Sequence, residues 1–513
     1  MFEHLIDLIS SRFPQQVREL ENIAVENPVI NAFVIDRLAS SSASRPHPFS
    51  LASDYTSWTS LTDRSYTGRH LPVADQSYTD FLTNVDVKEL GQLFRRQKDQ
   101  MICCVRSSVM FTAFAQWFTD GFLRTDSQDP RRNTSNHEID MCQIYGLKES
   151  ITNQLRLKEG GKLKSQIING EEYPPYAFEN GKLKDEFSEL TVWGPASTSI
   201  PLGLSPDEIE QRQAKMFAMG TERANSTLGY VMLNTLFLRE HNRIANLLKS
   251  KYSDWDDERL FQTARNVIIV LLIKIVVEDY IAHISGINLK ADPTIGYNQK
   301  WYRTNRMTIE FDLLYRWHSL TPDKFNTPVG LVNFNDYMYN NSLVIDYGIG
   351  KAFEALSNQK AGKIGLGNTP DFLFPIEQKN ISYARNFRLR SYNEYKVCFG
   401  GNKAKDFSDI TKNEELQKKL SDLYQSVDNV EWYVGMYAED RSPLALIGQL
   451  QTTMVANDAF SQALTNPLLA ERVFNKETFS SVGWEIINET NSLNQILQRN
   501  IDTNQNCSFH YAN

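Results

Sequence analysis

The sequence predicts a mainly α-helical fold with few short strands, on the basis of three patterns. Apolar residues recur at helical spacing along residues 228–251. The turn SDWDDE offers Asp256 as the N-cap of a second long helix, for which Gly286 is a plausible stop. Alternation of apolar and polar residues, which marks half-buried strands, is weak throughout the chain.

Other segments are predicted with less regular structure. A further helix is expected over 307–320, ending before Pro322. Residues 40–72 are rich in Ser, Pro, Tyr and Trp without helical periodicity, which predicts an extended connector wrapped on the body. The first forty residues contain the amphipathic pieces LIDLI and INAFVIDRL. These pieces suit either a membrane-facing or channel-entry segment or a helix packed on the core.

Composition excludes some classes of protein. The formal net charge of −8 gives no electrostatic reason to expect nucleic-acid binding. The longest apolar run, 267–277, is too short for the ~20 residues of a membrane span. Five cysteines without zinc-type spacing predict reduced thiols, and the N-terminus lacks the plan of a secretory signal. We therefore expect a cytoplasmic protein, and its 513 residues predict one very large domain or two fused lobes.

The most informative segment is FDLLYRWHSLTPD, residues 311–323. On a helix, Tyr315 and His318 lie three residues apart and share a face. A neutral imidazole is a common ligand of haem iron, and a phenol beside the macrocycle can lose an electron and a proton. By spacing alone, such a pair is more often an ordinary core or surface feature.

LYRWHSLTPDKF resembles the proximal-histidine segment of the prostaglandin-endoperoxide synthases, the animal cyclooxygenases of the animal-type haem peroxidase superfamily. FTAFAQWFTDGF resembles the distal haem helix of that family. Further similar segments follow in the same order, namely HEIDMCQIYG, TLFLREHNRIANLL, IKIVVEDYIAHISG, NNSLVIDYGIGKAFEALSNQKAGKIG, YNEYKVCFG and GWEIINE. The resemblance extends over roughly residues 30–510 and implies a cyclooxygenase-like haem peroxidase fold.

The resemblance implies roles for five residues. His318 matches the proximal ligand of a haem b iron, and Tyr315 matches the tyrosine whose radical removes hydrogen from a bis-allylic carbon. Tyr280 matches the tyrosine that hydrogen-bonds the radical tyrosine, or is an ordinary buried tyrosine. Gln116 matches the distal glutamine beside the oxygen-binding face. Arg37 lies where the family places the arginine that pairs with the substrate carboxylate, or is a solvated helix arginine.

Two departures concern the distal side. The family has a histidine four residues after the distal glutamine, whereas this chain has Asp120. A carboxylate is normally ionised and poorly matched to a proton shuttle, although burial could raise its pKa. Arg223 precedes the long helix, as an arginine does in the wider peroxidase and α-dioxygenase pattern. It would stabilise charge on a bound peroxide, or be an exposed arginine at a helix start.

Two further departures concern the substrate channel. Ile287 stands where the animal enzymes have a tyrosine that partners the carboxylate-binding arginine, and Ala459 aligns with the serine acetylated by aspirin. Carboxylate anchoring and product stereochemistry are therefore left open, and sensitivity to aspirin is not expected.

The sequence thus predicts a haem-dependent dioxygenase that adds O2 to a polyunsaturated fatty acid, with weak or absent peroxidase activity. We assign residues 1–40 to N-terminal amphipathic helices and 41–513 to the catalytic domain. Two alternatives remain: a haem oxidase of another hydrophobic or biosynthetic substrate, and a haem-binding relative without catalysis. Peripheral membrane contact and a homodimer, the state of the animal relatives, also stay open.

Overall fold

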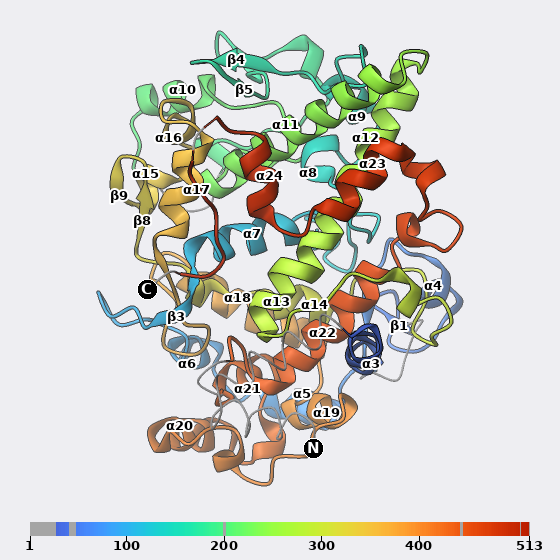
Figure 1. Ribbon diagram of the computed structural model, residues 1–513. Coiled ribbons are helices and arrows are strands. Elements are labelled where there is room, and N and C mark those ends of the chain that lie inside the picture. The colour runs from blue at the N-terminus through green and yellow to red at the C-terminus, as the bar shows by residue number, and fades with distance from the viewer. Residues whose placement is uncertain (1–26, 41–47, 198–201, 442–444, 503, 512–513) are drawn as a thin grey trace.

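Helices dominate the part of the chain that the computed structural model describes, residues 27–40, 48–197, 202–441, 445–502 and 504–511 (Figure 1). The strands are short and pair only as two-stranded antiparallel ladders. These ladders join β1 Phe49–Ser50 to β2 Gly68–Arg69, β3 Cys103–Ser108 to β10 Lys360–Gly362, β4 Gln166–Ile168 to β5 Glu171–Tyr173, β6 Phe178–Glu179 to β7 Lys182–Leu183, and β8 Lys324–Thr327 to β9 Gly330–Asn333. The expectation of a mainly α fold with few short strands is confirmed.

Two long helices cross the molecule as the sequence predicts. The first, α11, spans Leu228–Lys251, and the Thr227 side chain caps its N-terminus. The second, α12, spans Asp257–Ile275, and the Asp256 carboxylate accepts the backbone N–H of Arg259. It continues through a π-helical turn, Val276–Tyr280, into α13, Ile281–Ser285. Gly286 then ends the helix with a φ of 72°, a left-handed conformation that glycine adopts without strain.

The helix expected over 307–320 is wrong in its second half. The helix α14 spans only Ile309–Leu314, and a separate 3₁₀ turn, η5, begins at His318 and ends at Leu320. Side chains from distant helices donate hydrogen bonds to backbone carbonyls that would otherwise accept the next hydrogen bonds of α14. The Gln451 side-chain amide donates to the Leu314 carbonyl at 2.9 Å, and the Tyr437 hydroxyl donates to the Arg316 carbonyl at 2.8 Å. The chain therefore leaves helical geometry between Tyr315 and His318.

The other helices pack around α11 and α12 in one hydrophobic core. Helix α7, Val109–Thr119, lies against α11, and Ala113 comes so close to Gly229 that a Cβ on the glycine would lie 2.7 Å from the alanine Cβ. Helix α22, Gln449–Leu464, lies against α14. The remaining longer helices are α10 Pro206–Ala214, α17 Ile349–Ser357, α18 Phe374–Asn386, α20 Glu414–Tyr424 and α23 Lys476–Glu489; the shorter ones are α4 Trp58–Thr62, α5 Gln76–Leu82, α6 Val87–Gln92, α8 Cys142–Tyr145, α9 Glu149–Leu155, α15 Phe334–Tyr337, α16 Ser342–Ile345, α19 Tyr392–Cys398, α21 Trp432–Ala438 and α24 Leu493–Arg499.

The first described helix, α3, spans Pro28–Ala39 and packs on the body (Figure 1). The Asn457 side chain of α22 donates to the Ala39 carbonyl at 2.8 Å. The piece LIDLI lies outside the described residues. Among the described helices, none combines the length and the apolar character needed to cross a bilayer. All five cysteines are free thiols.

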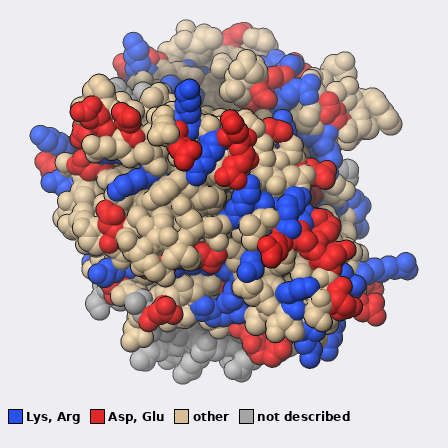
Figure 2. All heavy atoms as spheres, turned by 90° about the horizontal axis from the view of Figure 1, so that it is seen from above, with Lys and Arg blue, Asp and Glu red and all other residues tan. Residues whose placement is uncertain are grey.

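Charged side chains are mixed on the surface seen from above in Figure 2. Lysine and arginine alternate with aspartate and glutamate over this face, with uncharged areas between them.

The connector expected over 40–72 contains, in its described part, the pair β1–β2 and the short helix α4.

Candidate active site

Tyr315 stands at the end of α14, where the helix breaks. Its ring meets Phe311 edge-on with centroids 5.1 Å apart, and Trp317 with centroids 4.7 Å apart. Burial raises the pKa of Tyr315 well above its ordinary value. The phenol is therefore protonated at neutral pH, and its oxidation requires the loss of both a proton and an electron.

Tyr280 is fully buried on the π-helical turn that follows α12. Burial, and next the neighbouring Tyr315, raises the pKa of Tyr280, while the Tyr280 hydroxyl lowers the pKa of Tyr315. The two phenols are therefore close enough to influence each other, although the Tyr280 hydroxyl makes no hydrogen bond of standard geometry among the described residues. Phe111 stacks on the Tyr280 ring at 5.2 Å, and Phe114 packs at 5.3 Å.

His318 presents one ring nitrogen to the protein. Its Nδ1 lies 3.0 Å from Oε1 of Glu377 on α18, and its side chain is 18 % exposed. Among the described residues, no hydrogen bond engages Nε2. An imidazole held through Nδ1 with Nε2 available is the arrangement of a histidine that binds a metal. The predicted haem ligand therefore fits that role.

The middle of α7 also fits a bound macrocycle. Gln116 is exposed, although nearly every other residue of this helix is buried. Thr112, one turn earlier on the same face, is only partly buried. Rings join α7 to the segment that holds Tyr315 and His318, because Phe111 stacks on Trp317 with centroids 6.0 Å apart. An open face in an otherwise buried helix is where a large planar cofactor would be accommodated.

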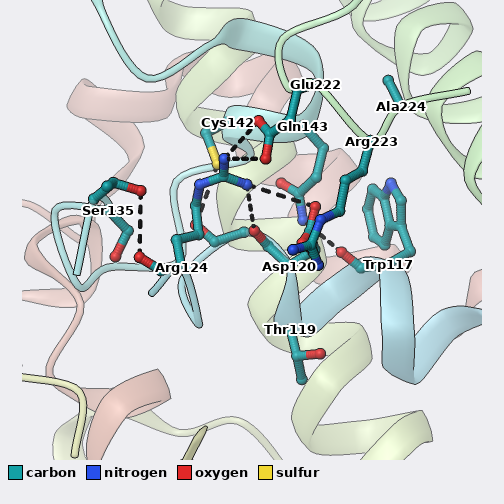
Figure 3. A network of polar contacts seen from close by, with 12 residues as sticks. Trp117, Thr119, Asp120, Arg124, Ser135, Cys142, Gln143, Glu222, Arg223 and Ala224 are labelled. Carbon is teal, nitrogen blue, oxygen red and sulfur yellow. Dashed lines mark hydrogen bonds and ion pairs between the residues drawn. The ribbon is translucent and has the colours of Figure 1, made fainter. Parts of the chain in front are cut away.

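Asp120 lies one turn after Gln116 and is part of a buried ion network (Figure 3). Its Oδ1 lies 3.1 Å from Nη1 of Arg223, and its Oδ2 lies 3.6 Å from Nη1 of Arg124. Arg124 in turn donates to both oxygens of Glu222, at 2.8 and 2.6 Å. Burial raises the pKa of Asp120 above its ordinary value, and the two guanidinium groups offset only part of that rise. Asp120 is thus the counterion of two arginines.

Arg223 comes from the segment before α11 and is 48 % exposed. Its guanidinium carbon lies 5.5 Å from the centre of the Trp193 ring, and Asp120 raises its pKa. The sequence singled out Asp120 and Arg223 separately, and the structure brings them together. Arg223 is neither a freely solvated arginine nor a fully buried one.

The three residues predicted for the substrate channel lie on neighbouring elements. Arg37 is on α3. This helix contacts α22, in which Ala459 is buried, and it also contacts the segment that follows Ile287. Arg37 is exposed, on the opposite side of α3 from the buried Ile35 and Ala39. Ile287 is partly buried. The structure therefore gathers these elements without directing the Arg37 side chain into the body.

Sequence reasoning missed several residues of the site. Glu377 lies 59 positions after His318, and Arg124 and Glu222 are separated by 98 positions. None stands in a recognisable motif, so only the fold reveals these pairings. The one usable signal was the unexplained excess of charge around the distal helix, in TDGFLRTD.

Comparison with known proteins decides the family. A model of the family described as animal haem peroxidase matches residues 51–510. The chain belongs to the animal haem peroxidase family. Among curated relatives, it is 34 % identical to prostaglandin G/H synthase 2 of Equus caballus over 90 % of this chain and 75 % of that protein. It is 33 % identical to prostaglandin G/H synthase 1 of Rattus norvegicus, with the same coverage.

Solved structures of a peroxidase and of fatty acid alpha-dioxygenases share the fold. Peroxidase A from Dictyostelium discoideum superposes with a TM-score of 0.67 at 18 % identity, covering 93 % of this chain and 99 % of that one. The fatty acid alpha-dioxygenase of Oryza sativa superposes with a TM-score of 0.67 at 16 % identity, covering 97 % and 94 %. The cyclooxygenase-like haem peroxidase fold expected from the sequence is confirmed.

Proposed function

We propose that the protein is a haem-dependent dioxygenase of the cyclooxygenase type that adds O2 to a polyunsaturated fatty acid through a Tyr315 radical. The observation that carries the proposal is the proximity of Tyr280 to Tyr315, together with His318 three residues later in the chain, whose Nδ1 contacts Glu377 and whose Nε2 is available. The names of the relatives, prostaglandin G/H synthases and fatty acid alpha-dioxygenases, agree with this substrate class. Haem b held by His318 would supply the one-electron oxidant.

The residues around Tyr315 suit hydrogen abstraction from a lipid. Aromatic rings pack against both tyrosines, which makes the surroundings of the radical apolar, as contact with an acyl chain requires. Tyr280 restrains the Tyr315 phenol and orients the oxygen that takes the substrate hydrogen. We propose Arg37 as the partner of the substrate carboxylate, and Ile287 and Ala459 as contacts of the acyl chain. A carboxylate anchored near the surface would leave the apolar end of the acid to reach the site.

We propose that peroxidase activity is weak. Asp120 replaces the distal histidine, and its two oxygens are held by Arg223 and Arg124. A carboxylate stabilised as an anion by two guanidinium groups is a poor carrier of protons at neutral pH. Gln116 and Arg223 remain on the distal side as groups that can orient and stabilise a bound peroxide. The product released would then be a hydroperoxide or an unreduced endoperoxide.

Oxygen uptake by the haem-loaded protein tests the function. Linoleate or arachidonate with a trace of hydroperoxide should give rapid uptake, and Tyr315→Phe should abolish it while leaving the haem spectrum intact. Tyr173→Phe is the matched control, because Tyr173 is a buried tyrosine whose hydroxyl binds Glu171 and the Val344 carbonyl and not Tyr315. His318→Ala should remove the haem spectrum.

The alternatives predict different results. Substantial turnover by Tyr315→Phe would contradict the radical mechanism. Uptake with another hydrophobic compound and none with fatty acids would favour an oxidase of that compound. A haem spectrum without turnover on any lipid or small molecule of the panel would favour a haem-binding protein without catalysis.

A further inference from the structure

His318 has a carboxylate partner that was not apparent from the sequence. Oε1 of Glu377 lies 3.0 Å from the His318 Nδ1, and the Glu377 side chain is only 2 % exposed. Glu377 belongs to α18, whose first turn follows Thr369 and Asn368 by a few residues. A direct carboxylate contact on the ring nitrogen opposite the free one determines how the imidazole can act.

The hydrogen bonds around Glu377 determine the direction of this contact. Asn380 donates to the Tyr433 hydroxyl at 2.9 Å, so the Tyr433 O–H is directed to Oε2 of Glu377, at 2.8 Å. The Thr369 hydroxyl donates to Oε1 at 3.0 Å. The Asn380 amide also donates to Oε2, at 3.5 Å, so both oxygens of Glu377 act as acceptors and His318 donates its Nδ1–H to Oε1. This tautomer leaves the lone pair on Nε2.

The backbone on both sides of the His318–Glu377 contact is fixed. The Thr369 N–H donates to the Phe94 carbonyl at 2.9 Å, and its carbonyl accepts from the Arg96 N–H at 2.8 Å. The buried Arg96 guanidinium then donates to the carbonyls of Ser319, at 3.3 Å, and Asn368, at 2.6 Å. One arginine thus joins the turn that follows His318 to the strand-like segment that precedes Glu377. The geometry of the pair is set by buried contacts and does not depend on flexible surface groups.

We propose that Glu377 is a positioning residue that makes His318 a strongly electron-donating ligand and thereby lowers the reduction potential of the haem. The proposal rests on the proposed function only in taking His318 as the haem ligand. A carboxylate that accepts the Nδ1–H draws the proton away from the ring and raises electron density at Nε2. Greater density at the ligand stabilises the oxidised metal over the reduced one, and Tyr433 and Thr369 tune the effect by sharing the carboxylate.

Glu377→Gln tests this inference with a redox titration of the haem-loaded protein. The amide keeps the size of the side chain and removes the negative charge. Loss of such a partner typically changes metal affinity 10–100-fold. If the oxidised haem loses at least tenfold more of this affinity than the reduced haem, the potential rises by about 59 mV for a one-electron couple. We therefore expect the potential to rise by at least about 59 mV. An unchanged potential in a variant that folds and binds haem would overturn the proposal.

Glu431→Gln is the matched control. Glu431 is also a buried carboxylate and directly precedes α21. Both of its oxygens accept hydrogen bonds from Arg385, and one also accepts from the Tyr424 hydroxyl; none of these contacts involves His318. Its substitution should lower stability and leave the potential unchanged. An equal potential shift in both variants would mean that buried charge in general, and not the contact with His318, sets the potential.

A measurement on the unmodified protein covers the case in which Glu377→Gln does not fold. Resonance Raman spectroscopy of the reduced haem-loaded protein should give an iron–histidine stretch at higher frequency than an imidazole complex of the same haem measured alongside. A frequency equal to that of the imidazole complex would overturn the inference. A potential shift without oxygen uptake would support the role of Glu377 and reject the fatty-acid function, so the two failures are distinguishable.

Discussion

Replacement of Asp120 by histidine should increase the peroxidase activity, which we propose to be weak in the unmodified protein. An imidazole at this position would lie one turn after Gln116 on α7, with Arg223 and Arg124 beside it. Neighbouring guanidinium groups disfavour the protonated ring, so the histidine would be neutral and able to accept a proton at pH 7. General acid–base assistance typically contributes 10²–10⁴-fold. We expect an increase in kcat/KM for hydroperoxide reduction in about that range.

The substitution has a cost in stability that the network allows us to estimate. Breaking a fully buried ion pair costs about 3–5 kcal/mol. Arg124 keeps both hydrogen bonds to Glu222, however, and Arg223 is 48 % exposed, so only part of that energy is lost. We expect Asp120→His to lower the free energy of unfolding by about 1–3 kcal/mol. Chemical denaturation at pH 7 measures this change.

Asp120→Asn separates the two effects. The amide removes the negative charge but cannot accept a proton in the way that an imidazole can. The Asp120→Asn variant should therefore lose stability like the histidine variant without gaining peroxidase activity. Stopped-flow oxidation of a reducing co-substrate by hydroperoxide would compare the three proteins. Strong activity in the unmodified protein that Asp120→Asn abolishes would refute our reasoning, because Asp120 would then be the proton carrier.

Three further predictions concern Tyr280, Asp279 and His241. Tyr280→Phe should lower the rate of oxygen uptake about 2–10-fold and broaden the electron paramagnetic resonance signal of the Tyr315 radical, since one restraint of about 0.5–1.5 kcal/mol is lost; an unchanged rate and signal would contradict the restraint. Burial raises the pKa of Asp279 from 3.8 to about 6, so the fold loses stability as pH rises through about 6. Asp279→Asn should therefore raise the free energy of unfolding by up to about 3 kcal/mol at pH 8 and leave it unchanged near pH 3, which urea unfolding at both pH values tests. Burial lowers the pKa of His241 to about 4, so the free energy of unfolding falls by up to about 3 kcal/mol as pH falls from 6.5 to 4. His241→Gln should remove that part of the pH dependence, and a pH profile of the unfolding free energy that the substitution leaves unaltered would contradict this prediction.

Local sequence signals predicted the long helices well. The limits of α11 follow from apolar spacing, and the start of α12 follows from the cap Asp256; both signals lie within a few residues of the feature that they determine. The break after Leu314 could not be predicted in this way. It depends on Gln451 and Tyr437, more than 100 positions away, whose side chains take the carbonyls of the would-be helix.

The candidate site shows the same division. Residue identities such as Tyr315, His318 and Asp120 could be selected from a resemblance along the chain. Their pairings could not, because Glu377 meets His318 and Arg223 meets Asp120 only through the fold. The ionisation of Asp120 in particular depends on two arginines, and the sequence alone left both a raised and an ordinary pKa open.

The two sides of the site differ in the kind of contact that holds them, and this difference bears on the reaction. On the distal side, Asp120 is tied to Arg223 and Arg124, and Arg124 to Glu222, so the charges are matched within the network and no neutral base stands among them. On the proximal side, hydroxyl and amide donors converge on Glu377, which turns His318 toward electron donation. A distal side with little capacity for proton transfer would support the initial oxidation of Tyr315 better than repeated reduction of peroxide, whereas an electron-rich proximal ligand would assist the O–O bond cleavage that starts the reaction. This balance favours a dioxygenase that needs only a trace of hydroperoxide to start and releases its peroxide product unreduced.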